Sequence, residues 1–438
     1  MNETAAKQPF MQDTVRLYQA YNITRQIVVI LGSILLAKSV MSLNEIGNFE
    51  TLLYLGQFMS IFWVNGLNQA FLTTYPKVIT EQKNDFVSSV FLLFLLISFA
   101  FSFILVVGKR IILPFLIDQN YIEGLYWFAL YSFANVPAIL IPSILLLKDN
   151  AKELIRFTLF YFVGYLLVFI LNYITGANLI NLLVLLNVFA FALLIVSVRL
   201  SFRPDFKLIS RKWIKRFLLI GSPLIGYSIL AGLAPLFDNW LVQQLYDDKS
   251  LFAIYRYGAR EFPITMTLAV GLSTSLLPAV SSNLGKGLNQ LKVRSTRLYP
   301  VVAISSAILI IISKYAFPVI FNPSFAASAP IFNIYILVII TRMVYPQTII
   351  LAIKKTRVLL YISIIELGIN IISSIMLGLK YGLIGIAIGT LIAFSIEKIL
   401  QAFYLRFRHD IRLSQYTDIK QFIIYSSFLL IVYFVFGL

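Results

Sequence analysis

The chain is a series of long apolar segments separated by short polar stretches. A helix needs roughly 17–25 apolar residues to cross a bilayer. Barrel strands would instead give short segments that alternate between apolar and polar positions, so helices are the expected spanning element. We predict twelve spans followed by a shorter apolar run at 421–437, the spans being 23–40, 50–74, 86–107, 123–147, 156–174, 179–198, 217–245, 252–277, 298–317, 330–352, 358–379 and 383–404.

Lys and Arg gather in alternate connections between these spans. If the N-terminus lies inside, the inner segments hold 26 of the 36 Lys and Arg residues and the outer segments hold 6. The richest stretch is 199–216, which mixes seven bases with Phe, Leu, Ile and Trp. Positive charge marks the cytoplasmic side of membrane proteins, so we expect a cytoplasmic N-terminus and an amphipathic segment on the inner leaflet.

Composition agrees with lipid as the solvent. Apolar residues make up 59% of the chain and charged residues 13%, against about 45–50% and about 25% in soluble proteins. The mean hydropathy is +0.86. Cys is absent and His occurs once, so thiol chemistry is excluded, and neither a metal site nor a cofactor is expected. The inner basic segments account for most of the net charge of +17, and nucleic acid is not needed to explain it.

The twelve spans divide into two similar halves. Arg25–Ser33 resembles Arg216–Ser222, and in each half a Gly-Leu pair, Gly66-Leu67 or Gly271-Leu272, is followed by Pro. Halves with six spans each would share one topology about an axis along the membrane normal. We therefore expect an all-α polytopic membrane protein with a first lobe at 1–198, a basic linker at 199–216, a second lobe at 217–404, and a cytoplasmic connection with an apolar segment at 405–438.

Charged residues inside the spans are the first candidates for function. A charge at a helix centre costs about 2.5–3.5 kcal/mol on insertion scales, so it should face protein or water. Reflection through the turns between spans places Asp238 level with Arg260, and Arg342 level with Glu366, which predicts two ion pairs. The candidates for binding an anion are Arg25, Arg256, Arg260 and Arg342, and the candidates for ion pairing or coupling are Asp238, Glu261 and Glu366.

Arg256 and Arg260 lie one helical turn apart, which favours a substrate role because Asp238 alone cannot neutralise both. A pair of guanidinium forks suits a diphosphate. Amides and aromatic rings near these residues are candidates for sugar hydroxyls: Gln57, Asn65, Asn68, Asn239 and Tyr257. Hydrogen bonding between helices is an equally good explanation for any single one of them.

Small residues and prolines mark special points of the predicted helices. Gly385-Ile-Ala-Ile-Gly389 has the spacing of close helix packing. Six prolines lie inside spans, where each predicts a kink or a partly unwound turn: Pro137, Pro142, Pro223, Pro235, Pro263 and Pro346.

Three motifs give the chain a family resemblance: Glu45–Phe49 before a span that ends near Gly66-Leu67, Gly221-Ser-Pro223 with Asp238, Phe252–Tyr255 and Leu277-Pro278, and Tyr381–Thr390. Together they resemble the polysaccharide-biosynthesis (O-antigen and capsule) branch of the multidrug/oligosaccharidyl-lipid/polysaccharide flippase superfamily, over about residues 20–405. The resemblance implies two six-helix lobes around a central cavity in the bacterial cytoplasmic membrane. It also implies outward flipping of an undecaprenyl-diphosphate-linked sugar unit, an anionic lipid-linked glycan, by a monomer.

Three alternatives stay open at this stage. A multidrug exporter of the same superfamily should have a net acidic lumen, whereas bases here at least equal acids. A flippase for the peptidoglycan lipid precursor would normally have fourteen spans. A membrane polymerase or ligase of glycans needs a large outer loop, but the loops are short and His409 lies in an inner connection, so we expect no enzyme.

The source of energy is not determined by the sequence. No Walker-type loop is present, which argues against ATP hydrolysis. An inside-negative potential favours outward movement of an anion by about 2.3 kcal/mol per charge per 100 mV. A proton or sodium ion carried by Asp238 or Glu366 is the alternative.

Overall fold

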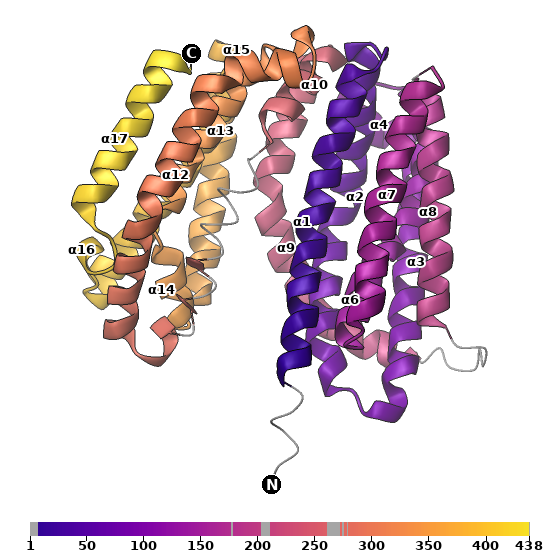
Figure 1. Cartoon of the computed structure of the whole chain (residues 1–438), viewed down its shortest axis with the longest axis horizontal. Helices are drawn as coiled ribbons and strands as arrows, with labels where there is room; N and C mark the ends of the chain where they lie inside the picture. The colour runs from indigo at the N-terminus through magenta and orange to yellow at the C-terminus, as the bar shows by residue number, and fades with distance from the viewer. Residues whose placement is uncertain are drawn as a thin grey trace. The chain divides into compact units, whose positions relative to one another are not determined.

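The computed structural model describes residues 8–176, 178–202, 211–260, 272–273, 276–277 and 279–437, and the described part is built from helices (Figure 1). Two compact units make up the chain. Unit 1 comprises Met1–Gly232 with Asp247–Ser250, and unit 2 comprises Leu233–Tyr246 with Leu251–Leu438. The expected all-α polytopic membrane protein is confirmed. The boundary between the units falls within a helix, and the division of the repeat at 198 and 217 stays a prediction.

Unit 1 contains eight α-helices and the first part of a ninth, each close to a predicted span or to an outer connection. Helix α1 packs along α7, and α5 packs along α8. The bounds are α1 Gln8–Lys38, α2 Leu43–Thr74, α3 Lys83–Val107, α4 Lys109–Ile117, α5 Leu125–Asn135, α6 Leu140–Leu147, α7 Ala151–Ile174, α8 Leu179–Ser201 and α9 Arg211–Leu245. The fourth predicted span corresponds to α5 and α6, which are joined at Val136–Ile139 by a 3-10 turn that contains Pro137, as the proline predicts.

Helix α2 begins seven residues before the predicted start of its span. The Ser42 side chain accepts a hydrogen bond from the Glu45 backbone N–H at 3.2 Å, and the Glu45 carboxylate accepts one from the Ser42 N–H at 2.9 Å. This capping box satisfies amide groups that the first turn leaves unpaired. The hydropathy pattern gave too late a start because the first turns of α2 are polar.

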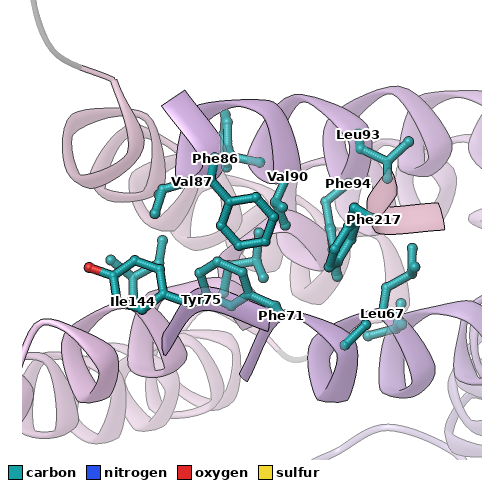
Figure 2. Packing of buried hydrophobic residues seen from close by; sticks show 14 of the residues in the cluster. Leu67, Phe71, Tyr75, Phe86, Val87, Val90, Leu93, Phe94, Ile144 and Phe217 are labelled. Atoms are coloured by element: carbon teal, nitrogen blue, oxygen red, sulfur yellow. The ribbon is translucent and has the colours of Figure 1, made fainter. Parts of the chain in front are cut away.

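An aromatic cluster ties the first half of α9 into unit 1. Phe217 is 1% exposed and packs against Phe86 with 5.7 Å between ring centroids, beside Phe94 and Leu67 from α3 and α2 (Figure 2). Lipid tails are as apolar as these side chains, so dispersion and close packing hold the helices together here. The part of α9 beyond Gly232, with Asp238, belongs to unit 2.

Unit 2 contains two broken spans that match sequence predictions. Helices α13 and α14 form one bent pair, with an angle of 46° where α14 begins at Pro346. Helix α15 is interrupted at Gly382, whose φ of +66° lies in the left-handed region. The remaining bounds are α10 Lys249–Gly258, α12 Leu284–Ile320, α13 Ser328–Arg342, α14 Pro346–Ala352, α15 Thr356–His409, α16 Leu413–Tyr416 and α17 Ile419–Phe436.

The apolar run near the C-terminus forms a full-length helix. Helix α17 lies alongside α12, with the rings of Phe422 and Tyr299 6.3 Å apart (Figure 1). Near its other end, the Asn333 amide of α13 donates to the Gly437 carbonyl at 3.1 Å. The segment is therefore long and apolar enough to cross a membrane, and it packs along another such helix.

Among the described residues, eight helices are long and apolar enough to cross a membrane, and nine are if the bent pair α13–α14 counts as one span. Helix α15 counts once in that number although it carries two predicted spans, 358–379 and 383–404. The centre of the predicted linker and most of the eighth predicted span lie outside the described residues.

Candidate functional site

A buried carboxylate in unit 2 is the centre of the candidate site. Asp238 lies on α9 and is 1% exposed. The Thr390 hydroxyl donates to its Oδ2 at 2.5 Å, and the Ser374 hydroxyl donates to its Oδ1 at 3.2 Å. A charged group in a membrane-embedded core is stable only with partners of this kind, because water is excluded there.

Two glycines let both halves of α15 reach Asp238. A Cβ on Gly389 would lie 2.6 Å from the Ser374 backbone nitrogen, and a Cβ on Gly385 would lie 1.9 Å from the Leu377 carbonyl oxygen. The two halves therefore approach backbone to backbone after the break at Gly382. The predicted packing role of the Gly385–Gly389 spacing is confirmed.

The group around Asp238 is rich in oxygen. The Thr390 and Ser374 hydroxyls lie 3.3 Å and 3.4 Å from the Ile386 carbonyl, and the Asn370 amide nitrogen lies 3.4 Å from the Thr390 hydroxyl. The Asn370 amide oxygen is buried with no hydrogen-bond partner. Carboxylate, hydroxyl, carbonyl and amide oxygens are the ligands of a hard cation, and the same carboxylate can also hold a proton.

Two tyrosines complete the surroundings. Tyr255 on α10 and Tyr335 on α13 share a hydrogen bond of 2.9 Å between their hydroxyls. Tyr335 is also close enough to bond to Asp238. Hydroxyl groups from three helices besides α9 therefore face one carboxylate. No group of three or more His, Cys, Asp or Glu side chains that could hold a metal occurs among the described residues.

The predicted ion pair between Asp238 and Arg260 is wrong. Within the described part of the chain, the Asp238 carboxylate is held by hydroxyl and amide groups of α13 and α15, and Arg260 lies 4.5 Å above the Tyr257 ring. Helix geometry predicted that the two residues lie at the same depth. It could not predict that α15 would pack against the Asp238 carboxylate. A neutral hydrogen-bonded cage replaces the expected charge pair.

Arg256 and Arg260 do not share one continuous helix as predicted. Helix α10 ends at Gly258, and Arg260 follows two residues later in a turn. Both side chains are half-buried. Arg256 is close enough to Tyr255 to interact electrostatically. Glu261, the third predicted carboxylate, lies outside the described residues.

Tyr257 supports Arg260 and is not itself open to a ligand. It is 1% exposed and is stacked on Phe325 with 4.3 Å between ring centroids, while Phe321 meets its edge at 5.1 Å. The aromatic enclosure fixes the ring on which the Arg260 guanidinium lies. Its predicted contact with a sugar is therefore indirect in this conformation.

The predicted pair of Arg342 and Glu366 is also wrong. Arg342 lies 6.0 Å from the Phe394 ring, and Glu366 interacts electrostatically with Glu397, Asp238 and Lys398. The sequence does not reveal that α15 folds back on itself, and this fold-back decides which residues face Glu366.

The amide candidates separate into two groups. Asn239 is buried and its amide donates to the Pro235 carbonyl of its own helix at 2.7 Å, while Asn68 accepts from the Ser143 hydroxyl at 2.9 Å. Gln57 and Asn65 on α2 have exposed side chains, as does Arg25 on α1. Helix packing therefore explains Asn239 and Asn68, whereas Gln57, Asn65 and Arg25 are accessible within unit 1.

Sequence reasoning missed the polar side chains that surround Asp238: Ser374, Thr390, Asn370 and Tyr335. One signal was present. Asn370 and Ser374 are four residues apart in an apolar span and share a helix face, and Thr390 follows the Gly385–Gly389 spacing. Polar residues at that spacing, next to a close-packing motif, indicate a buried polar contact.

Comparison with solved structures identifies the class of fold. The arrangement of helices is similar to that of solved membrane transporters, and two of these structures illustrate it. A lipid II flippase, MurJ, in an inward closed conformation has a TM-score of 0.70 at 21% identity, over 96% of this chain and 92% of that one. A MATE family multidrug resistance transporter in an inward-facing conformation has a TM-score of 0.61 at 13% identity, over 87% and 94%.

A third structure is a MOP superfamily transporter from Pyrococcus furiosus, described as having a binding pocket of reverse polarity. Its TM-score is 0.54 at 12% identity, over 92% of this chain and 96% of that one. No family model matches the chain, and no curated protein matches it. At these identities the likeness establishes the fold and not the substrate.

Proposed function

We propose that this protein moves a polyprenyl-diphosphate-linked saccharide from the inner to the outer leaflet of a bacterial cytoplasmic membrane, coupled to a monovalent cation at Asp238. The observation that carries the proposal is the Asp238 carboxylate, buried in a membrane-embedded unit and held by both halves of one broken helix. A site shared by two halves of a helix couples ion occupancy to their relative position. This is the requirement for alternating access.

The basic residues of α10 and α13 support a diphosphate as the recognised group. Arg256 and Arg260 lie within five residues of each other, and the Tyr257 ring holds the Arg260 guanidinium in place. Planar guanidinium groups give two-point contacts to phosphate oxygens. The fixed orientation of Arg260 reduces the entropy lost when a phosphate binds.

The polysaccharide precursor is favoured by the motifs that resemble that branch, and a peptidoglycan precursor is the second candidate. The MurJ structure, whose substrate is lipid II, has a TM-score of 0.70. Helix α17 is long and apolar enough to add a span to the twelve predicted, which weakens the objection from span number. Both substrates carry a diphosphate, and the same assay separates them.

The test is flipping by the purified protein in proteoliposomes. A fluorescent polyprenyl-diphosphate-linked oligosaccharide and lipid II would be compared, with headgroup accessibility to an impermeant reagent as the readout. We expect the wild-type protein to flip the polyprenyl-diphosphate-linked oligosaccharide. We expect Arg260→Ala to lower the flipping rate at least ten-fold at an unchanged protein level. Arg297→Ala, a basic residue of the inner part of α12, is the control. Normal flipping by Arg260→Ala and Arg256→Ala would overturn the role of the guanidinium groups.

A further inference from the structure

A polar seam runs through unit 2 from Asp238 toward the basic end of α15. Because α15 turns back at Gly382, its two halves run side by side in opposite directions. The Ser373 hydroxyl lies 3.1 Å from the Gly389 carbonyl, and the Asn370 amide lies 3.4 Å from the Thr390 hydroxyl. Glu366, which lies further from the break in the first half, interacts electrostatically with Glu397 and Lys398 of the second half.

Glu366, Asn370 and Ser374 form a buried stripe at four-residue spacing, with exposed fractions of 8%, 0% and 0%. Ser374 touches Asp238. Glu366 lies eight residues before Ser374, which places it about 12 Å nearer to the start of α15. That start carries Lys354, Lys355 and Arg357, which mark the predicted inner side.

The end of the seam near Glu366 contains a second charged cluster. Lys398 lies 3.1 Å from the Glu397 carboxylate and 3.5 Å from the Gln347 oxygen, and the Gln401 amide donates to Glu397 at 2.8 Å. Glu397, Asp238 and Lys398 all act electrostatically on Glu366. Lys398 is thus already shared with Glu397, and Glu366 is not closed off by a direct ion pair.

Three acceptor oxygens along this seam are buried without a donor: Glu366 Oε1, Asn370 Oδ1 and Gln401 Oε1. A buried oxygen without a partner costs about 1–3 kcal/mol. Each is an acceptor, and an acceptor is satisfied by a cation, a proton or a water molecule. Along the seam, Glu366 lies between Asn370 and Gln401. This order suits successive binding positions for one small cation.

We propose that Glu366 is a second cation station, through which the ion held at Asp238 passes toward the inner face of the membrane. The inference rests on the coupling role proposed for Asp238. The ion is monovalent, a sodium ion or a proton, because Asp238 is a single carboxylate among neutral oxygens, and Glu397, the second carboxylate near Glu366, is already paired with Lys398. Glu366 then acts on the rate of passage, and Asp238 acts on equilibrium binding.

The test compares equilibrium binding with exchange across a membrane. Binding of radioactive sodium to purified protein and sodium exchange in proteoliposomes would be measured for Glu366→Gln, Glu366→Asp, Gln401→Leu and Asp238→Asn. A parallel arm without sodium would follow proton movement with an enclosed pH indicator. We expect Glu366→Gln to bind within two-fold of wild type yet exchange at least ten-fold more slowly, with Glu366→Asp restoring part of the rate.

The outcomes separate the two proposals. If Asp238→Asn loses binding while Glu366→Gln exchanges at the wild-type rate, the second station is wrong and the coupling site survives. If Asp238→Asn binds and exchanges normally, both proposals fail. Gln401→Leu covers the case in which Glu366→Gln does not fold, because it removes a neutral acceptor of the same seam. An unchanged exchange rate in a folded Gln401→Leu protein counts against the path.

Discussion

At the level of single side chains, Asp238 depends on donors far away in the chain. Ser374 and Thr390 are 136 and 152 residues away, and each donates one hydroxyl to a different carboxylate oxygen. A hydrogen bond to a charged group contributes about 1.5–3 kcal/mol, more than most surface ion pairs. The surroundings of this carboxylate are therefore set in part by two hydroxyl groups.

We predict that Thr390→Val weakens cation binding about ten-fold, equivalent to about 1.4 kcal/mol. Valine keeps the shape of threonine but removes the group that donates to Asp238 at 2.5 Å. Sodium titration of purified protein measures the change. Thr341→Val is the matched control, because the Thr341 hydroxyl bonds only within its own helix, to the Val338 carbonyl at 2.8 Å. Equal losses in both variants would mean that the Thr390 hydroxyl has no special role.

Lys249 gives a prediction for pH. It lies in the turn before the eighth predicted span and is 6% exposed, and burial lowers its pKa to about 8, against the opposing effect of Asp247 and Asp118. In the unfolded chain the pKa is about 10.4. Between these values the unfolded state binds more protons, so the free energy of unfolding rises as the pH increases from about 8 to about 10.4.

Thermal unfolding in detergent between pH 7 and pH 10.5 measures this slope. We expect Lys249→Met to remove the rise, because the titrating group is gone. Lys38→Met, at the exposed outer end of α1, should leave the rise in place. A slope that persists in Lys249→Met belongs to another group.

At the level of elements, α15 is the structure on which the site depends. One helix of 54 residues is split at Gly382, where a φ of +66° suits glycine and strains other residues. The two halves then pack closely because Gly385 and Gly389 have no side chain. The ligand positions of Ser374 and Thr390 are a consequence of this packing.

We predict that Gly389→Ala lowers both thermal stability and cation affinity. The added methyl would lie 2.6 Å from the Ser374 nitrogen, which forces the halves apart and moves Ser374 from Asp238. Gly368→Ala in the same helix is the control, because a Cβ there meets nothing within 4 Å. That control should be neutral or stabilising by up to about 1 kcal/mol. Binding that survives in Gly389→Ala would show that the close approach is not required.

At the level of the whole molecule, the spans and the charge pattern predict an orientation. With the predicted inner N-terminus, the twelve predicted spans followed by α17 would place the end of α17 outside. The chain has no cysteine, so single-cysteine variants report position without further changes. Ser414 lies before α17, and Phe436 is the last residue of α17 and is half-exposed.

We predict that an impermeant maleimide added to intact cells labels Phe436→Cys and Asn322→Cys but not Ser414→Cys or Lys355→Cys. Opening the cells should make the last two reactive. Labelling of Ser414→Cys from outside, with Phe436→Cys protected, would reverse the orientation. Protection of both positions would mean that α17 does not end at the outer surface.

The sequence by itself determined which segments enter the membrane, because the free energy of transfer into lipid depends on local composition over about twenty residues. It also determined the bend at Pro346 and the close packing at Gly385–Gly389, since both follow from the local stereochemistry of proline and glycine. The C-terminal apolar run was visible in the sequence, and the structure shows that it forms a helix that packs along α12.

Only the tertiary structure decided which groups meet. The predicted partners of Asp238 and Glu366, which were Arg260 and Arg342, are not the groups that they meet, because rotation about each helix axis is set by neighbours that no local pattern encodes. The fold-back at Gly382 brings Ser374 and Thr390 to Asp238, and Glu397 and Lys398 act electrostatically on Glu366. The hydrogen bond between Asp238 and Thr390, which are 152 residues apart, results from tertiary packing. The sequence shows only that both residues are polar.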